Sequence, residues 1–333
     1  MSNKILITGG TGFLGSYIIA ELVSKNYPVR AIRRGNKLPA HIDPAILAKV
    51  EWVEGDILDV MSLEDAMHGI HTVIHAAAIV SFSASDKQKM MQVNVDGTAN
   101  VVNMALEAGT SRFVYISSVA AVGRDAAGGS VDESRKWQES STSTQYAISK
   151  HKAEMEVWRA MGEGLDAVIL NPSTILGFGD WQSGSSALFR NVYNEFPWYS
   201  PGLNGFVDVE DVARATVLLM ESAITEERFI INGDNWTFQR LFETMADHLH
   251  KKRPSRETTR FLAGVAWRLE KIKSMLTGSR PVLTRESARV AFSKTMFNSS
   301  KLLAALPGFS FTSLDETIRK AGSRYLEAAN SGK

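Results

Sequence analysis

A glycine-rich loop close to the start of the chain constrains the possible fold more than any other feature. Residues 8–15 read TGGTGFLG, after an apolar run at residues 4–7 and before residues 15–25, where apolar side chains recur at helical spacing. A strand, a glycine loop and a helix in this order can bind a pyrophosphate, because glycines let the backbone approach the phosphates and the helix start offers free N–H groups. The alternative, a tight turn with only a structural role, does not need this context. The residues expected to bind a dinucleotide here are Gly9, Thr11, Gly12, Phe13, Leu14 and Gly15.

Strand and helix signals alternate along the first two thirds of the chain. Apolar runs typical of strands lie at residues 4–7, 29–32, 51–54, 72–75, 112–116, 167–170 and 228–231. Patterns of helical period lie between them, at residues 15–25, 63–67, 88–108, 143–161 and 208–222. This alternation predicts an α/β fold with a doubly wound parallel sheet, the Rossmann fold. The strands are continuous apolar runs, which fits a sheet covered on both faces.

The pattern changes in two places, and these changes predict the domain organisation. Residues 177–205 are rich in Gly, Ser and aromatic residues, and beyond residue 232 the chain has helical patterns with no strong strand. We expect residues 1–176, with 206–233 returning to them, to form the dinucleotide-binding core. Residues 177–205 and 234–333 are expected to form a smaller, mainly helical substrate-binding lobe.

Composition narrows the classes of function. The chain has 333 residues, a formal net charge of +1 and no cysteine. Disulfides and thiolate metal sites are therefore excluded, no metal is expected, and the charge gives no argument for nucleic acid. The sequence has no apolar run of the ~18 residues that a membrane span needs and no signal-peptide pattern. A small-molecule substrate and a cytoplasmic location are the expectations.

The end of the second predicted strand bears on the choice of cofactor. In dinucleotide-binding folds an acidic residue at this position binds the ribose hydroxyls, whereas an arginine accommodates a 2′-phosphate. This chain has Arg33 and Arg34 there and no acid. Guanidinium groups bind phosphate through paired hydrogen bonds. We therefore expect NADP(H) rather than NAD(H), the alternative being a solvated basic strand end.

Two further segments follow predicted strands and can contact a cofactor. Asp56 follows the third strand, where its carboxylate can accept a hydrogen bond from an adenine amino group. The alternative for Asp56 is a turn closed by its own side chain. Ala76, Ala77 and Ala78 follow the fourth strand, where small side chains let a cofactor lie against the backbone. Tight helix packing explains these alanines almost as well.

Five polar residues are candidates for the catalytic group. Tyr146 and Lys150 lie four apart in a predicted helix and so share a face. A neighbouring ammonium can lower the pKa of a tyrosine from its usual ~10, so that the phenol can exchange a proton with an alkoxide. Ser117 and Ser118 end the fifth strand, where a hydroxyl can bind a substrate oxygen. Asn94, inside a predicted helix, can bind a water molecule or a backbone carbonyl.

Taken together, these motifs resemble those of the extended short-chain dehydrogenases/reductases. The shared features are the glycine loop, Asp56-Ile57, His75 to Ala78, Asn94 to Thr98, Ser117-Ser118, Tyr146-x-x-x-Lys150, Asn171 to Ser173 and Phe206 to Ala213. They occur in family order over residues 4 to 215. Within the NAD-dependent epimerase/dehydratase superfamily, the chain looks most like the dihydroflavonol reductase and 3β-hydroxysteroid dehydrogenase branch.

The resemblance implies a role for each matching residue. Tyr146 is the general acid/base, Lys150 binds the nicotinamide ribose, and Ser118 orients the substrate carbonyl. Asn94 supports them. The remaining residues that the resemblance places at the cofactor are Arg33, Arg34, Asp56, Ile57, Ala76, Ala77, Ala78, Pro172 and Ser173. A homodimer that pairs the helices bearing Asn94 and Tyr146 is a family-level expectation.

The resemblance leaves three functions open. The first is an NADP(H)-dependent oxidoreductase, of the class that interconverts carbonyl and CH–OH groups, with an apolar or aromatic substrate. The second is a nucleotide-sugar epimerase or dehydratase with tightly bound NAD. It is disfavoured because members of that kind often carry arginine at Asn171 and basic residues in the 177–205 region, which offers only Arg190. The third is a protein that binds NADP(H) without turnover.

A segment at residues 258–276 has apolar residues at helical spacing with basic residues between them. The apolar positions are Phe261, Leu262, Val265, Leu269, Ile272 and Leu276. A helix of this kind can lie on a membrane surface. More often it packs its apolar stripe on the fold, which is our expectation here.

Overall fold

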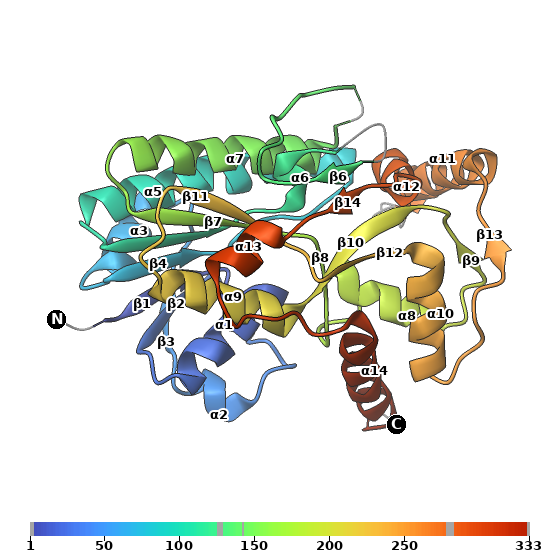
Figure 1. Ribbon diagram of the computed structural model, residues 1–333, viewed down its shortest axis with the longest axis horizontal. Coiled ribbons are helices and arrows are strands. Elements are labelled where there is room, and N and C mark those ends of the chain that lie inside the picture. The colour runs from blue at the N-terminus through green and yellow to red at the C-terminus, as the bar shows by residue number, and fades with distance from the viewer. Residues whose placement is uncertain (1–2, 125–128, 142, 278–282, 332–333) are drawn as a thin grey trace.

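A computed structural model describes residues 3–124, 129–141, 143–277 and 283–331. Its centre is a sheet of seven parallel strands in the order β11-β7-β5-β4-β1-β2-β3, with helices on both faces (Figure 1). This is the predicted doubly wound Rossmann fold. The strands are β1 (Ile5–Thr8), β2 (Val29–Arg33), β3 (Glu51–Glu54), β4 (Thr72–His75), β5 (Arg112–Ile116), β7 (Ala167–Pro172) and β11 (Glu227–Ile231).

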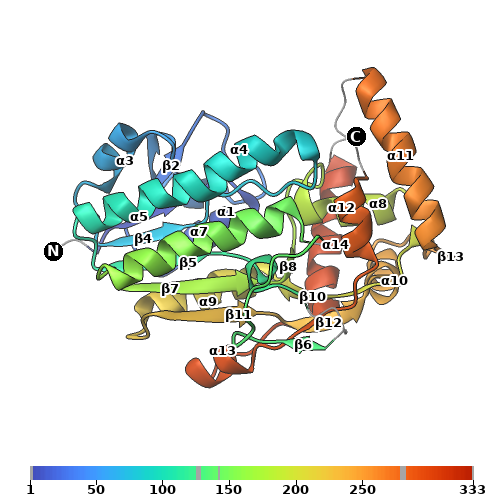
Figure 2. The same cartoon turned by 90° about the horizontal axis from the view of Figure 1, so that it is seen from above.

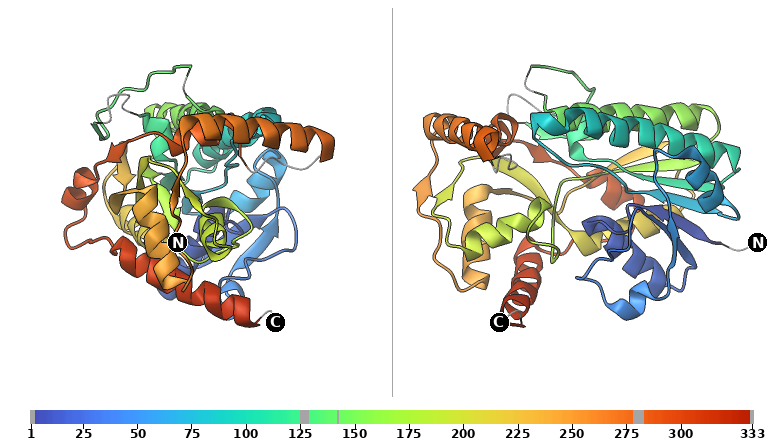
Figure 3. Two further views of the ribbon diagram at one scale, coloured as in Figure 1. Left: turned by 90° about the vertical axis from the view of Figure 1, so that its right-hand side faces the viewer. Right: turned by 180° about the vertical axis from the view of Figure 1, so that it is seen from behind.

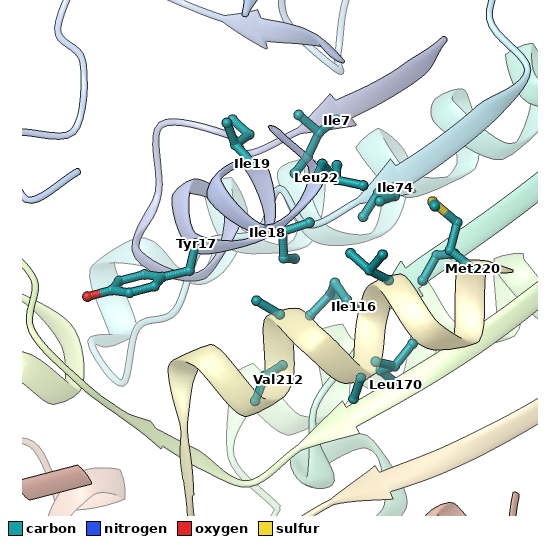
Figure 4. Packing of buried hydrophobic residues seen from close by; sticks show 14 of the residues in the cluster. Ile7, Tyr17, Ile18, Ile19, Leu22, Ile74, Ile116, Leu170, Val212 and Met220 are labelled. Carbon is teal, nitrogen blue, oxygen red and sulfur yellow. The ribbon is translucent and has the colours of Figure 1, made fainter. Parts of the chain in front are cut away.

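Two hydrophobic cores cover the sheet. Alternate residues of a strand point to opposite faces, so Ile5 and Ile7 enter one core and Leu6 the other. Figure 4 shows the first core, to which Ile18 of one helix and Val212 of another contribute together with the sheet. The helices on this face are α1 (Phe13–Ser24), α2 (Pro44–Leu47) and α9 (Val209–Glu221). Those on the other face, seen from above in Figure 2, are α3 (Val60–Met67), α5 (Gly97–Glu107) and α7 (Gln145–Gly162).

The strand order fixes where a ligand can bind. β1 lies between β2 and β4. After β1 the chain continues to β2 on one side of the sheet, and after β4 it continues to β5 on the other side. Ligands of open parallel sheets bind at such a switch point, outside the carboxyl ends of the strands. The glycine loop follows β1, and therefore lies at this point.

The predicted helix at residues 88–108 is interrupted. A short turn at Ala84–Asp86 leads into α4 (Lys87–Met91), and a π-helical turn at Gln92–Asp96 separates α4 from α5. Wider π-helical turns occur often at functional sites. Asn94 lies in this turn.

The expectation of no strong strand beyond residue 232 is wrong. β12 (Asp234–Thr237) pairs antiparallel with β10 (Leu203–Asp208), which pairs with β8 (Thr174–Leu176) to form a second sheet. β12 is largely polar and buries only Trp236, so it has no apolar run to detect. Two short pairs complete the strands, β9 (Trp198–Tyr199) with β13 (Arg256–Glu257) and β6 (Ser130–Val131) with β14 (Met296–Phe297).

The second sheet and three helices enclose a third core. Phe178, Trp181 and Tyr193 pack against it, and the Trp181 and Tyr325 rings stack with centroids 5.2 Å apart. At least these aromatic residues of the 177–205 region are structural. The helices are α8 (Ala187–Tyr193), α10 (Phe238–His248) and α14 (Leu314–Ser331). The remaining helices are α6 (Val119–Val122), α11 (Arg260–Thr277), α12 (Arg285–Ala291) and α13 (Ser300–Ala305), the last of which packs against β11.

The expectation that α11 packs its apolar stripe on the fold is also wrong. Phe261 and Ile272 are 77% and 54% exposed, and Leu262, Val265 and Leu269 are exposed as well. The side chain of Leu276 lies outside the described residues. Within the described part of the chain, no helix is both long enough and apolar enough to cross a bilayer. The division of the chain into a core and a lobe at residues 176, 206 and 233 stays a prediction.

Candidate active site

The glycine loop is built so tightly that two of its glycines are required. Gly9 has a φ of +74°, and a Cβ there would lie 2.6 Å from the amide nitrogen of Ala77. A Cβ on Gly15 would lie 2.2 Å from the carbonyl oxygen of Gly9. Gly12 is the N-cap of α1 and has no side chain to satisfy the first N–H groups of that helix. The loop thus presents backbone N–H groups at a helix start, which is the arrangement that binds a pyrophosphate.

The segment after β4 lies against this loop. Thr8 Oγ1 lies 3.3 Å from the Ala77 N–H and 2.6 Å from His75 Nδ1. The other ring nitrogen of His75 lies 2.9 Å from Thr98 Oγ1. Complete burial lowers the pKa of His75 to about 3, so the ring is neutral and holds β1, β4 and α5 together. Ala76 and Ala77 are half-buried and Ala78 is exposed, as a surface for a cofactor requires.

A pocket of about 410 Å³ lies beyond the ends of β2 and β3. Arg34 and Asp56, both predicted, line it. Asp56 Oδ1 also accepts a hydrogen bond of 3.0 Å from the Leu58 amide. The turn closed by the Asp56 side chain, which was the alternative interpretation of this residue, is therefore present as well. Arg33 is not among the lining residues, and the Ile57 side chain packs in the second core. The lining residues that the sequence did not reveal are Leu58, Ser85, Gln88, Lys89, Gln92 and Val93.

Asn94 connects the loop after β4 to α7. Its side chain is buried, and its amide forms hydrogen bonds with both the N–H (2.7 Å) and the carbonyl (2.9 Å) of Ile79. Asn94 Nδ2 also donates to Ser149 Oγ at 3.0 Å. Ser149 directly precedes Lys150, so Asn94 fixes the position of α7 relative to the sheet edge. The supporting role that the resemblance implies for Asn94 stays a prediction.

Tyr146 and Ser118 meet at the carboxyl edge of the sheet. Ser118 caps α6 and accepts a 3.2 Å hydrogen bond from the Ala120 amide. Burial raises the pKa of Tyr146, and a hydrogen bond with the Ser118 side chain opposes that rise. The neighbouring Ser117 points the other way, toward Glu154 at 2.7 Å. Of the two serines, Ser118 is therefore the one beside the tyrosine.

Lys150 is buried beneath Tyr146. Its ammonium donates to the Tyr115 hydroxyl at 2.7 Å and to the Ile116 carbonyl at 2.9 Å. Burial lowers the pKa of Lys150 to about 7, and the negative charge of Glu154 opposes this. The sequence predicted that this lysine lowers the pKa of Tyr146. In the structure the pKa of Tyr146 is raised instead, because the phenol is withdrawn from water.

A buried carboxylate organises the groups behind the catalytic candidates. Glu154, one helical turn after Lys150, is fully buried and accepts hydrogen bonds from Ser117 and from Asn171 Nδ2, the latter at 2.8 Å. It also forms an ion pair of 3.1 Å with Arg228 of β11. Asn171 donates in addition to the Ser118 carbonyl at 3.0 Å. The guanidinium of Arg228, from the strand next to β7, therefore reaches the Glu154 carboxylate. Family members often have an arginine on β7 itself, at the position of Asn171.

Comparison with known proteins agrees with this geometry. The sequence model of the NAD dependent epimerase/dehydratase family matches residues 5–232. The chain belongs to this family. It is 30% identical to a putative dihydroflavonol 4-reductase of Synechocystis over 96% of this chain and 94% of that protein. It is 31% identical to sterol demethylase protein B of Methylococcus capsulatus over 75% of each chain. The crystal structure of gox2253 superposes with a TM-score of 0.82 and 29% identity over 98% of both chains.

The epimerase/dehydratase family includes oxidoreductases of the dihydroflavonol reductase type, which confirms the resemblance stated from the motifs. The chain is accordingly an enzyme of the extended short-chain dehydrogenase/reductase type.

The residues present fit the family's nicotinamide cofactor. The cradle formed by Gly9 and Gly15 leaves no room for side chains at the phosphates. Next to β11, Ser173 is buried and its hydroxyl has no hydrogen-bond partner within the protein, as a group awaiting a ligand would be. Pro172 precedes it at the end of β7 and is buried. Ser173 lies in the segment that the resemblance places beside the nicotinamide.

Several residues of the site carried little sequence signal. Glu154 follows Lys150 by four positions, so the shared helix face could have revealed it. Tyr115 ends a strand that was predicted correctly. Arg228 lies near the start of β11, and nothing local links it to Glu154, because the pairing depends on β11 lying beside β7.

Proposed function

We propose that this enzyme is an NADP(H)-dependent oxidoreductase that interconverts a ketone or aldehyde and the corresponding alcohol. The observation that carries the proposal is the hydrogen bond between the side chains of Tyr146 and Ser118, just beyond the carboxyl end of β5, with buried Lys150 one helical turn after the tyrosine. A protein that only bound the dinucleotide would need no such group of proton-exchanging side chains.

Each side chain has a distinct part in the proposed reaction. When bound, the nicotinamide supplies or accepts a hydride. The Ser118 hydroxyl donates a hydrogen bond to the substrate oxygen, which Tyr146 protonates as negative charge develops there. Lys150 is held by Tyr115 and Ile116, and its ammonium stabilises the phenolate that the proton transfer leaves. In the opposite direction Tyr146 accepts the proton from the alcohol.

NADP(H) is the proposed cofactor because of the charge around the pocket beyond β2 and β3. Arg34 and Lys89 both line it and can neutralise a 2′-phosphate, while Asp56 can accept from the adenine amino group. We expect Arg34→Gln to raise the KM for NADPH about tenfold or more and to leave that for NADH within twofold, since one phosphate contact is lost. Lys37→Gln, an exposed cation nearby, is the control. Equal loss for both cofactors would contradict this assignment.

The proposed substrate is apolar. Sterol demethylase protein B, one of the relatives, is named for its action on sterols. Arg190, the basic residue of the 177–205 region, is hydrogen-bonded to Gln182, which leaves little to bind a sugar diphosphate. A homodimer and a cytoplasmic location stay predictions.

Tyr146→Phe tests the mechanism. Removing the hydroxyl should lower kcat by about 10²- to 10⁴-fold, the range of general acid–base catalysis, while NADPH binding stays within twofold. Turnover is measured with a panel of ketones, aldehydes and nucleotide sugars, and binding by nicotinamide fluorescence. Full activity in this variant would overturn the proposed mechanism. Tightly bound NAD in the purified protein, with turnover of nucleotide sugars alone, would indicate an epimerase or dehydratase instead.

A further inference from the structure

Helix α11 presents its apolar side to solvent. It lies at the end of the molecule opposite the N-terminus, along the outer edge (Figures 1 and 3). Phe261, Ile272 and Met275 are 77%, 54% and 77% exposed, and they share one face of the helix. At the ~100° per residue of an α-helix, the exposed apolar residues form a stripe about 140° wide. The other members of this stripe are Leu262, Val265 and Leu269.

The opposite side of α11 is the one that faces the protein. Ala263 is buried, and Gly264, Ala266 and Trp267 are half-buried. A surface helix of a globular protein usually buries its large apolar residues and exposes the small and polar ones. The reversed arrangement here leaves a contiguous apolar surface without a covering element among the described residues. Surfaces of this kind mark sites of interaction.

Basic residues flank the stripe on both edges. Arg260 and Lys271 lie along one edge and Lys273 along the other, by helical position. Arg268 falls within the stripe by helical position, and its guanidinium lies over the Trp267 ring. The helix has a single acidic residue, Glu270, which lies on the side opposite the stripe. The apolar surface is thus framed by positive charge.

We propose that α11 docks the protein onto an anionic lipid surface, with the stripe in the acyl region and the flanking cations at the lipid phosphates. Long basic side chains reach from a buried helix to the headgroups. The charge argues for lipid over a second copy of the chain, because two such helices packed stripe to stripe would bring cations of like sign together. Peripheral docking also needs no membrane-spanning helix.

The position of α11 connects this surface to the candidate active site. α12 packs against α11, and Glu286 of α12 accepts a hydrogen bond of 3.2 Å from the Gln145 amide, next to Tyr146. Docking would therefore hold the start of α7 close to lipid, where an apolar substrate is dissolved. That consequence rests on the proposed function, whereas the docking itself does not.

Vesicle flotation of the full chain tests the proposal, with no cofactor or substrate present. We expect binding to vesicles of phosphatidylglycerol and phosphatidylcholine, little binding to phosphatidylcholine alone, and release at about 0.5 M salt, where charges are screened. Arg260→Gln with Lys271→Gln should lower partitioning roughly twenty-five-fold, since each cation near the surface contributes about a factor of five. The matched control is Lys49→Gln with Lys320→Gln, two exposed lysines on other helices or turns.

A single-cysteine label tests which surface enters the lipid. Because the chain has no cysteine, Met275→Cys can carry one environment-sensitive fluorophore. Met61→Cys is a matched control, since Met61 of α3 is also 77% exposed. Anionic vesicles should shift the emission of the label at position 275 to the blue and leave that at position 61 unchanged.

Three results would overturn the proposal. The first is no binding to anionic vesicles at low salt. The second is equal binding by Phe261→Ser with Ile272→Ser, a change of two exposed side chains that leaves the cores intact. The third is a dimer, seen by sedimentation, that the same change dissociates while vesicles have no effect. Each outcome leaves the proposed reaction untouched, because binding is measured without turnover.

Discussion

Helices α7 and α11 have 18 residues each and place their side chains in opposite ways. α7 buries Lys150 and Glu154 under the sheet edge, whereas α11 leaves Phe261 and Met275 in solvent. Both arrangements run against the general preference for apolar residues inside and charged residues outside. By our two proposals, each exception lies where the protein meets something else, the reactants at α7 and lipid at α11.

The comparison shows that a buried charge requires hydrogen-bonding partners, whereas an exposed apolar residue requires none. Glu154 is tolerated inside because Ser117, Asn171 and Arg228 all direct donors at it. Without them its burial would cost several kcal/mol. An exposed apolar side chain needs no partner for folding, so α11 can vary without disturbing the cores. The predictions below, ordered by the size of the expected effect, test this difference.

Removing the buried carboxylate should have the largest effect on stability. Glu154→Ala removes the fully buried carboxylate that pairs with half-buried Arg228 and accepts from Ser117 and Asn171, and we expect the free energy of unfolding to fall by about 3–5 kcal/mol. Urea denaturation followed by circular dichroism measures it. The same substitution two residues later, Glu156→Ala, removes a partly exposed ion pair with Arg159 and should cost no more than ~1 kcal/mol. Similar losses in the two variants would show that the network around Glu154 is unimportant.

Acid should lower the free energy of unfolding through His75, which connects β1, β4 and α5. Its pKa is about 3 in the folded protein because it is buried, against ~6.5 when unfolded. The unfolded state therefore binds more protons between these values, so this contribution is complete above pH ~6.5 and is lost as the pH falls toward 3. The expected slope is about 1.4 kcal/mol per pH unit.

The measurement is urea denaturation of wild type and His75→Gln between pH 7 and pH 4.5, with exposed His68→Gln as the control. The slope should be smaller in His75→Gln and unchanged in His68→Gln. Titration of His75 near pH 6.5 by NMR would contradict the assignment.

Truncating one apolar residue of each helix gives the smallest effects and the most direct comparison. Val157 of α7 is fully buried in the second core, so Val157→Ala should lower the free energy of unfolding by about 2 kcal/mol. Ile272→Ala on α11 should change it by less than ~0.5 kcal/mol, since the side chain is already in water. A large loss at Ile272 would mean that the stripe supports the fold after all.

Local sequence was sufficient to predict the sheet and the glycine loop. The apolar residues of the seven strands located them, although β3 has only Trp52 and Val53, and Gly9 and Gly15 follow the first strand at fixed spacing. The Tyr146 and Lys150 pair was also recognisable, because both residues belong to one helix. The role of Lys150 was less predictable, since the hydroxyl of Tyr115 and the carbonyl of Ile116 come from a strand far away in the chain.

By itself the sequence determined the doubly wound sheet, the glycine cradle and the helix that carries the candidate catalytic pair, since each depends on neighbours within a few residues. Only the tertiary structure decided that Ser117 points to Glu154, that Arg228 pairs with Glu154, and that the apolar side of α11 faces outward. Periodicity shows that a helix has an apolar face, but which way that face turns depends on which distant elements are available to cover it.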